Sequence, residues 1–375
     1  MNCLAQDADR FFFASRHCRD SVNKALIEMV ENTIHLPLSN EYAKKWTGAC
    51  WAMELMLYRP KVFEAKIPTH LLQLPKLNNT LQYAYLEMLY TPYPYQFQKH
   101  VTALLKKIEH EKVKAIAWEY VVRGRNTNGW KKDVGLKNST YYSAFLYQRS
   151  KEKTKLPSIE DFIDPSFLPG EAVLCSFQYA NRNQSGFLMI RKADGNWLSN
   201  EQGVAMKFPQ LARSITNLPS YLTNGNTPQG LYMITGTDRS ENPWIGPTIN
   251  LQLIMPFENG NKTFFGTDTA YDHHYQQLLG DKLKHFQGLY ESFTSGKLGR
   301  TEIIAHGTTI DPNLYASQPF YPFTPSLGCL CSPEQWNDDG IRIKSIQQEW
   351  MLQMQSMEKK PRYLIVAEIS ATATQ

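Results

Sequence analysis

The sequence predicts an α+β protein: an N-terminal all-helical domain over residues 1–155, followed by a mostly β domain over residues 156–375. Three observations support this division. Apolar residues recur at helical spacing through most of the first 124 positions. A polar and basic stretch with several prolines follows at 148–170, which is typical of a domain boundary. From Glu171 onward, the apolar runs shorten to strand length.

The N-terminal domain is expected to be built from amphipathic helices. Ser39 is a suitable N-cap for the second helix, and Pro60 ends it. The helical segments are expected at Asp20–Glu31, Ser39–Arg59, Thr80–Tyr90 and Gln96–Gly124. Their aromatic residues are expected to pack between helices more readily than to bind sugars: Tyr83, Tyr85, Trp118 and Tyr120.

The second domain is expected to contain short strands separated by turn residues. The strands are expected at Ala172–Tyr179, Gly186–Arg191 in a hairpin with Trp197–Leu198, Leu231–Thr235, Ile249–Met255 and Tyr363–Ala367, the last closing the sheet. Two helices are expected among them, a surface helix at Tyr271–Leu283 and a second helix at Ile343–Met357.

Composition describes an ordinary globular protein, with 42% hydrophobic and 20% charged residues. The formal net charge of +5 is spread along the chain, which suits an anionic polymer better than a neutral ligand. It is far from the basic footprint of a nucleic-acid-binding protein, so no nucleic-acid partner is expected. No apolar run is long enough for a transmembrane segment. The oligomeric state cannot be inferred.

The residues from Glu302 to Gln335 carry the strongest chemical signal. An apolar run ends on His306-Gly307-Thr308, where a strand is expected to end. One loop later comes Ser326-Leu327-Gly328-Cys329-Leu330-Cys331. Ser332-Pro333-Glu334-Gln335 follows at once and has the pattern of a helix start, with Ser as N-cap and Pro at the first helical position. Cys329 is therefore expected in a tight turn just before a helix N-terminus.

These residue types suit nucleophilic catalysis by a thiol. A cysteine attacks as the thiolate, which a nearby imidazole or a positive helix end favours. The Gly307 carbonyl is the nearest group that could fix the tautomer of His306. The backbone N–H groups of Leu327, Gly328 and Cys329 could turn toward a developing oxyanion, because Gly328 lacks a side chain.

The two motifs resemble those of the L,D-transpeptidase (YkuD-like) catalytic domain, which carries a His-Gly motif and then a Ser-x-Gly-Cys motif. A third similarity lies upstream, where Thr227-Pro228-Gln229-Gly230 leads into the apolar run at Leu231. The resemblance covers roughly the last half of the chain. It implies a mixed β-sandwich and a thioester formed by Cys329 on the peptide stems of peptidoglycan, with His306 moving the proton and no cofactor or metal. It also implies acylation of this thiol by carbapenem β-lactams.

The chain departs from the family pattern in the neighbourhood of the thiol. Leu327 stands where the family usually has His, and Cys331 where it has Arg or Asn. The loop between the two motifs is longer than usual, and the apparent insertion is 311–325, rich in Tyr, Phe and Pro. We expect Ser326, and Tyr315 and Tyr321 of this insertion, to bind the donor peptide.

A periplasmic or cell-envelope location is implied by the substrate of the family. No export signal is visible in this numbering. Cys3-Leu4-Ala5 carries small residues at the two positions that a signal-peptidase site prefers, so it is interpreted as the tail of a signal peptide whose start lies upstream.

Three alternatives stay open. The first is a non-catalytic envelope-binding or scaffolding protein that retains the fold, which Leu327 and Cys331 motivate. The second is a papain-like peptidase or amidase, although there the Cys usually precedes the His. The third is a zinc site that combines Cys-x-Cys and His306 with the pair His273-His274.

Overall fold

The computed structural model describes residues 10–125, 139–151, 154–268 and 272–370. The expected signal-peptide tail at Cys3-Leu4-Ala5 lies outside these residues. None of the described helices is both long enough and apolar enough to cross a membrane.

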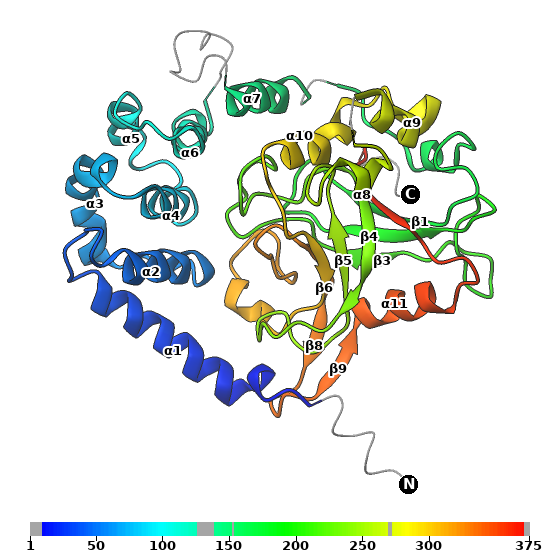
Figure 1. The fold of residues 1–375 in the computed structure, drawn as a ribbon. Helices are drawn as coiled ribbons and strands as arrows, with labels where there is room; N and C mark the ends of the chain where they lie inside the picture. Colours follow the sequence, from blue (N-terminus) through cyan, green and yellow to red (C-terminus); the bar gives the residue numbers. More distant parts are fainter. Residues whose placement is uncertain (1–9, 126–138, 152–153, 269–271, 371–375) are drawn as a thin grey trace. The chain divides into compact units, whose positions relative to one another are not determined.

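The chain divides into two compact units, which Figure 1 shows as ribbons. The β unit comprises Met1–Arg19, Arg149–Ser214 and Gly225–Gln375, and the helical unit comprises Asp20–Gln148 and Ile215–Asn224. A single boundary is expected at residue 155. In the structure the chain passes from the helical unit to the β unit at Arg149, and two segments lie in the unit opposite to the expected one: Met1–Arg19 in the β unit and Ile215–Asn224 in the helical unit.

Specific contacts hold each of these two segments in its unit. In the β unit, the Phe11 N–H donates to the Gly340 carbonyl (2.8 Å), and the Phe13 ring meets the Trp244 ring edge-on at 5.0 Å. In the helical unit, the Tyr221 hydroxyl donates to the buried Glu119 carboxylate (2.7 Å). In the sequence, a polar and proline-rich linker marks only the boundary that follows the helical half, at 148–170.

The helices of the N-terminal half follow the expected segments, with two additions. They are α1 Arg16–Thr33, α2 Ala43–Leu55, α3 Lys61–Gln73, α4 Asn79–Tyr90, α5 Gln98–Leu104, α6 Glu111–Val122 and α7 Thr140–Lys151. The sequence did not predict α3, which contains Pro68, or α7. Tyr85, Trp118 and Tyr120 are buried, which confirms the expected packing role of these aromatic residues.

The β unit contains an eight-stranded mixed sheet with the strand order β3-β2-β1-β10-β4-β5-β6-β7. Its strands are β1 Val173–Gln178, β2 Gly186–Arg191, β3 Phe208–Gln210, β4 Gly230–Asp238, β5 Asn250–Ile254, β6 Ile304–His306, β7 Leu330–Cys331 and β10 Tyr363–Glu368. The pairs β1–β10 and β6–β7 are parallel, and the other neighbours are antiparallel. The strand expected to close the sheet, β10, instead lies between β1 and β4.

Each face of this sheet supports its own core, as the alternation along β10 shows. Ile365 belongs to a core with residues of α9 (Asp272–Leu283) and α10 (Glu291–Lys297), whereas Leu364 belongs to a core with α11 (Ile346–Ser356). The short helix α8 (Asn261–Phe265) adds Phe264 to the first core. The α+β class is therefore confirmed, whereas a sandwich of two packed sheets is not.

One expectation about helices is confirmed and one is wrong. The surface helix expected at Tyr271–Leu283 is α9, which exposes one face, including Gln276 and Gln277, and fully buries Tyr275, Leu279 and Leu283 on the other. The helix start expected at Ser332 is a second, two-stranded sheet formed by β8 (Glu334–Trp336) and β9 (Arg342–Ser345). Helix α11 begins only at Ile346, where the Ser345 hydroxyl accepts from the Gln348 N–H (3.0 Å).

Candidate functional site

The parallel pairing of β6 and β7 brings the two thiol-site motifs together at one end of the sheet. Ala305 pairs with Leu330, and His306 pairs with Cys331. Ala305 and Leu330 both belong to the core beneath the sheet, so His306 and Cys331 point to the other face. Cys329 lies two residues before Cys331, in the turn that leads into β7.

Hydrogen bonds within the Ser-x-Gly-Cys motif hold the turn that carries Cys329. The Ser326 hydroxyl accepts from the Gly328 N–H (3.0 Å) and donates to the Cys329 carbonyl (2.9 Å). The Thr227 hydroxyl, from the upstream Thr-Pro-Gln-Gly motif, donates to the Gly328 carbonyl (2.9 Å). All three motifs therefore meet around Cys329.

Arg300 explains why position 328 is a glycine. The backbone of Gly328 has a φ of 115°, and an added Cβ would lie 2.3 Å from Nη2 of Arg300 and 2.5 Å from the Gly225 carbonyl oxygen. Arg300 is itself buried, and its guanidinium donates to the carbonyls of Gly225 (2.6 Å) and Asn226 (2.9 Å). Its charge favours the thiolate of Cys329.

The His306 ring is buried and is oriented by its own neighbour in the chain. Nδ1 bonds to the Gly307 carbonyl, the group expected from the sequence. A carbonyl only accepts, so Nδ1 carries the proton and Nε2 keeps its lone pair. Burial lowers the pKa of His306, and the bond to Gly307 opposes this effect. The histidine is therefore a neutral imidazole with a free basic nitrogen.

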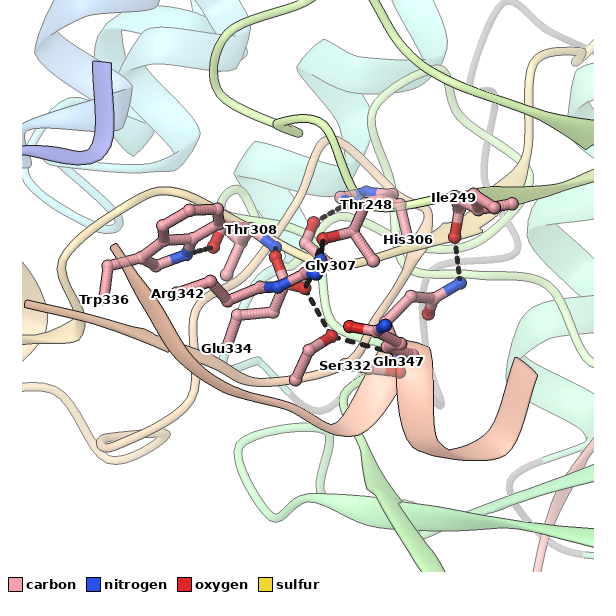
Figure 2. Close-up of polar contacts among 12 residues, drawn as sticks. Thr248, Ile249, His306, Gly307, Thr308, Ser332, Glu334, Trp336, Arg342 and Gln347 are labelled. Atoms are coloured by element: carbon pink, nitrogen blue, oxygen red, sulfur yellow. Dashed lines mark hydrogen bonds and ion pairs between the residues drawn. The ribbon is translucent and has the colours of Figure 1, made fainter. Parts of the chain in front are cut away.

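A buried carboxylate, Glu334, supports the loop that follows His306 (Figure 2). One carboxylate oxygen accepts from the Thr308 N–H (3.0 Å), and the other accepts from the hydroxyls of Thr248 (2.6 Å) and Ser345. Burial raises the pKa of Glu334, while these bonds and the charge of Arg342 lower it. The carboxylate is thus a shared acceptor for three separate segments.

Glu334 also accounts for the glycine of the His-Gly motif. A Cβ at position 307 would lie 2.2 Å from the carboxyl carbon of Glu334 and 2.3 Å from one of its oxygens. Only glycine lets the backbone approach the carboxylate this closely. The motif glycine and the buried acid are therefore one structural unit.

Further hydrogen bonds hold the backbone on both sides of His306 (Figure 2). The Trp336 indole N–H donates to the Thr308 carbonyl (2.9 Å). The Gln347 amide, from α11, donates to the carbonyl of Ala305 (2.9 Å). The Ser332 N–H donates to the His306 carbonyl (2.9 Å). The imidazole therefore projects from a backbone with little freedom to shift.

The Cys329 thiol is half-buried and rests against backbone. It donates to the Glu302 carbonyl at 3.5 Å. Burial raises its pKa, while the Ile304 N–H and Arg300 oppose that effect. The expected helix N-terminus is absent at this position, because Ser332 begins no helix. Within the described residues, no hydrogen bond joins His306 to Cys329 or to Cys331.

The second thiol, that of Cys331, is less accessible than that of Cys329. Its side chain is buried, and its contact with the Ser332 carbonyl is 4.0 Å long. Burial raises its pKa, and the nearby Glu334 and Cys329 raise it further. Cys331 is therefore the partner of His306 in the strand register, but Cys329 is the more accessible of the two thiols.

The proposed oxyanion donors differ in their availability. The Gly328 N–H already donates to Ser326. Leu327 is 44% exposed, and its N–H has no acceptor in the part of the chain that the structure describes. The N–H groups of Leu327 and Cys329 are thus both without an acceptor among the described residues, whereas engagement of the Gly328 N–H would require its bond to Ser326 to open.

The insertion contains two tyrosines with opposite environments. Tyr315, at the end of the 3₁₀-helix Pro312–Tyr315, is fully buried, and its ring packs on Phe320 with centroids 5.4 Å apart. The expectation that Tyr315 binds the substrate is therefore wrong, because its ring is buried inside the loop. Tyr321 is 45% exposed, and its hydroxyl donates to Asn313 (3.3 Å).

No metal site is indicated among the described residues. Within them, no group of three or more His, Cys, Asp or Glu side chains is arranged to hold a metal ion. His273 and His274 lie at the start of α9, with their ring centroids 3.9 Å apart. The zinc alternative, which needed these histidines beside Cys329 and Cys331, therefore has no support.

Sequence reasoning missed Glu334 and Arg300. Glu334 was assigned to a helix start, and Arg300 was not assigned at all. Neither carries a local signal, because each acts on a motif that lies tens of residues away in the chain. The glycines at 307 and 328 were the available indication that something packs closely there.

Comparisons with known proteins found no matching family model, no matching curated protein and no matching solved structure. The function is therefore inferred from the chemistry of the site and from the three motifs.

Proposed function

We propose that this protein is a cysteine-dependent acyltransferase of the L,D-transpeptidase class, which acts on the peptide stems of peptidoglycan with a β unit of the sandwich type found in that family. One observation carries the proposal. The hydrogen bond from Thr227 to the Gly328 carbonyl, with the parallel pairing of β6 and β7, gathers the Thr-Pro-x-Gly, His-Gly and Ser-x-Gly-Cys motifs around Cys329.

The resting site favours an attack that is coupled to proton transfer. A raised thiol pKa and a lowered imidazole pKa disfavour a thiolate–imidazolium pair before the substrate binds. We infer that the donor peptide displaces the Cys329 thiol from the Glu302 carbonyl and turns it toward Nε2 of His306. Sγ then attacks the carbonyl carbon while its proton passes to Nε2.

The remaining steps use the same groups. The tetrahedral oxyanion accepts from the Leu327 N–H, and its collapse breaks the bond to the terminal D-amino acid. The leaving amine takes the proton from His306, and a thioester remains on Cys329. An amine of a second stem, or water, attacks the thioester carbonyl and passes a proton through His306 to the departing thiolate. The first acceptor gives a cross-link and the second gives carboxypeptidase activity.

The proposal includes a location in the periplasm or cell envelope, because the substrate lies there, and needs no cofactor. The export route is not part of it.

The direct test is turnover of a purified stem tetrapeptide that ends in a D-amino acid. Mass spectrometry should detect the released D-amino acid, together with a cross-linked dimer or a tripeptide. The matched control is the same peptide with an L-residue at its end, which should not be turned over. Equal turnover of both peptides, or of neither, contradicts the proposal.

A non-catalytic envelope-binding protein is the second candidate. The bond from the thiol to the Glu302 carbonyl and the raised pKa of the thiol favour it, because both disfavour attack. This candidate predicts saturable binding of stem peptides with no covalent adduct, and the same affinity in Cys329→Ala as in the unaltered chain.

A further inference from the structure

The helical unit contains a cavity that the acyl-transfer proposal does not use. Its volume is about 640 Å³, and α2, α4 and the segment Ile215–Asn224 contribute to its walls. Polar side chains of four residues line it: Thr47, Glu54, Glu87 and Asn224. Trp51 supplies an aromatic wall, and the exposed Lys44 also lines the cavity.

Two carboxylates on neighbouring helices line this cavity. Glu54, on α2, is 2% exposed, and Glu87, on α4, is 5% exposed. The Glu87 side chain bonds to Asn224, but its Oε1 is buried and has no hydrogen-bond partner among the described residues. A buried carboxylate oxygen without a donor is destabilising. A hydrogen-bond donor that arrives with a ligand would satisfy this oxygen.

The environment of the pair supports a cationic ligand. Burial raises the pKa of both carboxyls, that of Glu87 to about 8, and the charge of Glu87 raises the pKa of Glu54 further. The charge of Lys112, on α6, lowers the pKa of Glu87 and offsets only part of the effect of burial, and the two carboxylates raise the pKa of the neighbouring Cys50 thiol on α2. A bound cation would stabilise the ionised pair.

A metal ion fits this site poorly, because the described residues offer no third acidic, His or Cys ligand there. A primary ammonium group fits better. It has three N–H donors, enough for an oxygen of each carboxylate and for a neighbouring hydroxyl such as that of Thr47. The Trp51 ring adds a surface against which a cation is attracted.

We propose that the cavity of the helical unit binds a primary ammonium group, carried by a small molecule or by a peptide side chain, between Glu54 and Glu87. This site is independent of the proposed acyl transfer at Cys329.

Isothermal titration calorimetry of the full chain at pH 7 tests this proposal, with 1,5-diaminopentane as the probe. 1,5-Pentanediol, which has the same length and no charge, is the matched ligand control. We expect saturable binding of the diamine alone. Titration in two buffers of different ionisation enthalpy should show proton release, because the bound cation stabilises the ionised carboxylates and thereby lowers their pKa.

Variants then locate the binding. Glu54→Gln and Glu87→Gln should each weaken binding about tenfold or more, the loss expected for a hydrogen bond between charged groups. Glu119→Gln is the matched control, since Glu119 is also buried in the helical unit but bonds to Tyr221 and does not line the cavity. Thermal melting of each variant confirms folding.

Several outcomes would overturn the proposal. These are equal binding of the diol, undiminished binding in the folded Glu54→Gln and Glu87→Gln proteins, or no saturation by the diamine at concentrations on the order of 10 mM. In the last case the two carboxyls merely share a proton in the interior of the unit.

Discussion

At the scale of single residues, the site holds the Cys329 thiol and the His306 imidazole in their neutral forms. Burial raises the pKa of Cys329 and lowers that of His306. This resting state protects the thiol from modification and leaves Nε2 of His306 able to accept a proton. The imidazole is thus expected to matter through proton transfer in the reaction rather than through a preformed thiolate.

Replacement of the base tests this role. His306→Ala should lower the rate of acylation at neutral pH about 100-fold or more, the usual contribution of a general base. The rate should recover in part as pH rises toward the raised pKa of the thiol, because a growing fraction of the thiol is then deprotonated without the histidine. Stopped-flow or quenched mass spectrometry across pH measures both effects. A loss under about threefold would mean that another base serves the thiol.

The acid beneath the His-Gly loop gives a second prediction at this scale. In Glu334→Gln, the amide cannot accept from the Thr308 N–H and from the Thr248 and Ser345 hydroxyls in the same arrangement. We expect the free energy of unfolding to fall by about 1 to 3 kcal/mol, and the melting temperature to fall by about 2 to 4 °C for each kcal/mol.

Glu349→Gln, which changes an exposed carboxyl of α11, is the control and should melt as the unaltered protein does. A Glu334→Gln protein that melts with its control would show that the carboxylate is not a structural acceptor.

At the scale of elements, the insertion at 311–325, between His306 and Cys329, is a packed loop with one exposed ring. Tyr315 and Phe320 pack together, and the Arg213 guanidinium lies 4.3 Å from the Phe320 centroid. Tyr321 lies outside this cluster. An exposed ring on a proline-stiffened loop loses little entropy when it contacts a ligand.

The two tyrosines should therefore respond differently to truncation. Tyr315→Ala should lower the melting temperature by several degrees, because loss of a buried aromatic side chain costs about 3 to 5 kcal/mol. Tyr321→Ala should melt normally and weaken binding of the donor peptide. Calorimetric melting and peptide titration of both variants measure this. Normal melting of Tyr315→Ala would contradict the packing role of Tyr315. Unchanged peptide binding in Tyr321→Ala would contradict the binding role of Tyr321.

Sequence patterns predicted local features at this scale better than long-range ones. The periodicity around Ile249 and Tyr363 predicted β5 and β10, and the apolar run before Gly307 predicted β6. The pattern at Ser332-Pro333 misled, because Glu334 pairs with Ser345 in a β-ladder and tertiary pairing overrides a local capping preference. The order of strands and the burial of Tyr315 depend on contacts between distant segments, which no local pattern contains.

At the scale of the whole molecule, stability should depend on pH through the buried acids of the helical unit. Folding raises the pKa of Glu87 from its ordinary value of 4.5 to about 8. The folded chain thus keeps a proton that the unfolded chain releases within this window. The free energy of unfolding therefore falls as pH rises from about 4.5 to about 8, by an amount on the order of a few kcal/mol.

Denaturant titrations at several pH values measure this slope. Glu87→Gln, which cannot ionise, should flatten it and should raise stability near pH 8. Glu109→Gln, at an exposed carboxyl of the same unit, is the control. A slope that Glu87→Gln leaves unchanged would mean that another group controls the pH dependence.

The central claim concerns the chemistry of one thiol, and the most direct measurement is the mass of the protein after incubation with the stem tetrapeptide, followed by peptide mapping. We predict one thioester adduct on Cys329, which is absent from Cys329→Ala and still measurable in Cys331→Ser. A single carbapenem adduct should map to the same residue. An adduct that survives in Cys329→Ala and is lost in Cys331→Ser would identify the other thiol as the nucleophile, and a folded protein that forms no adduct would contradict the account.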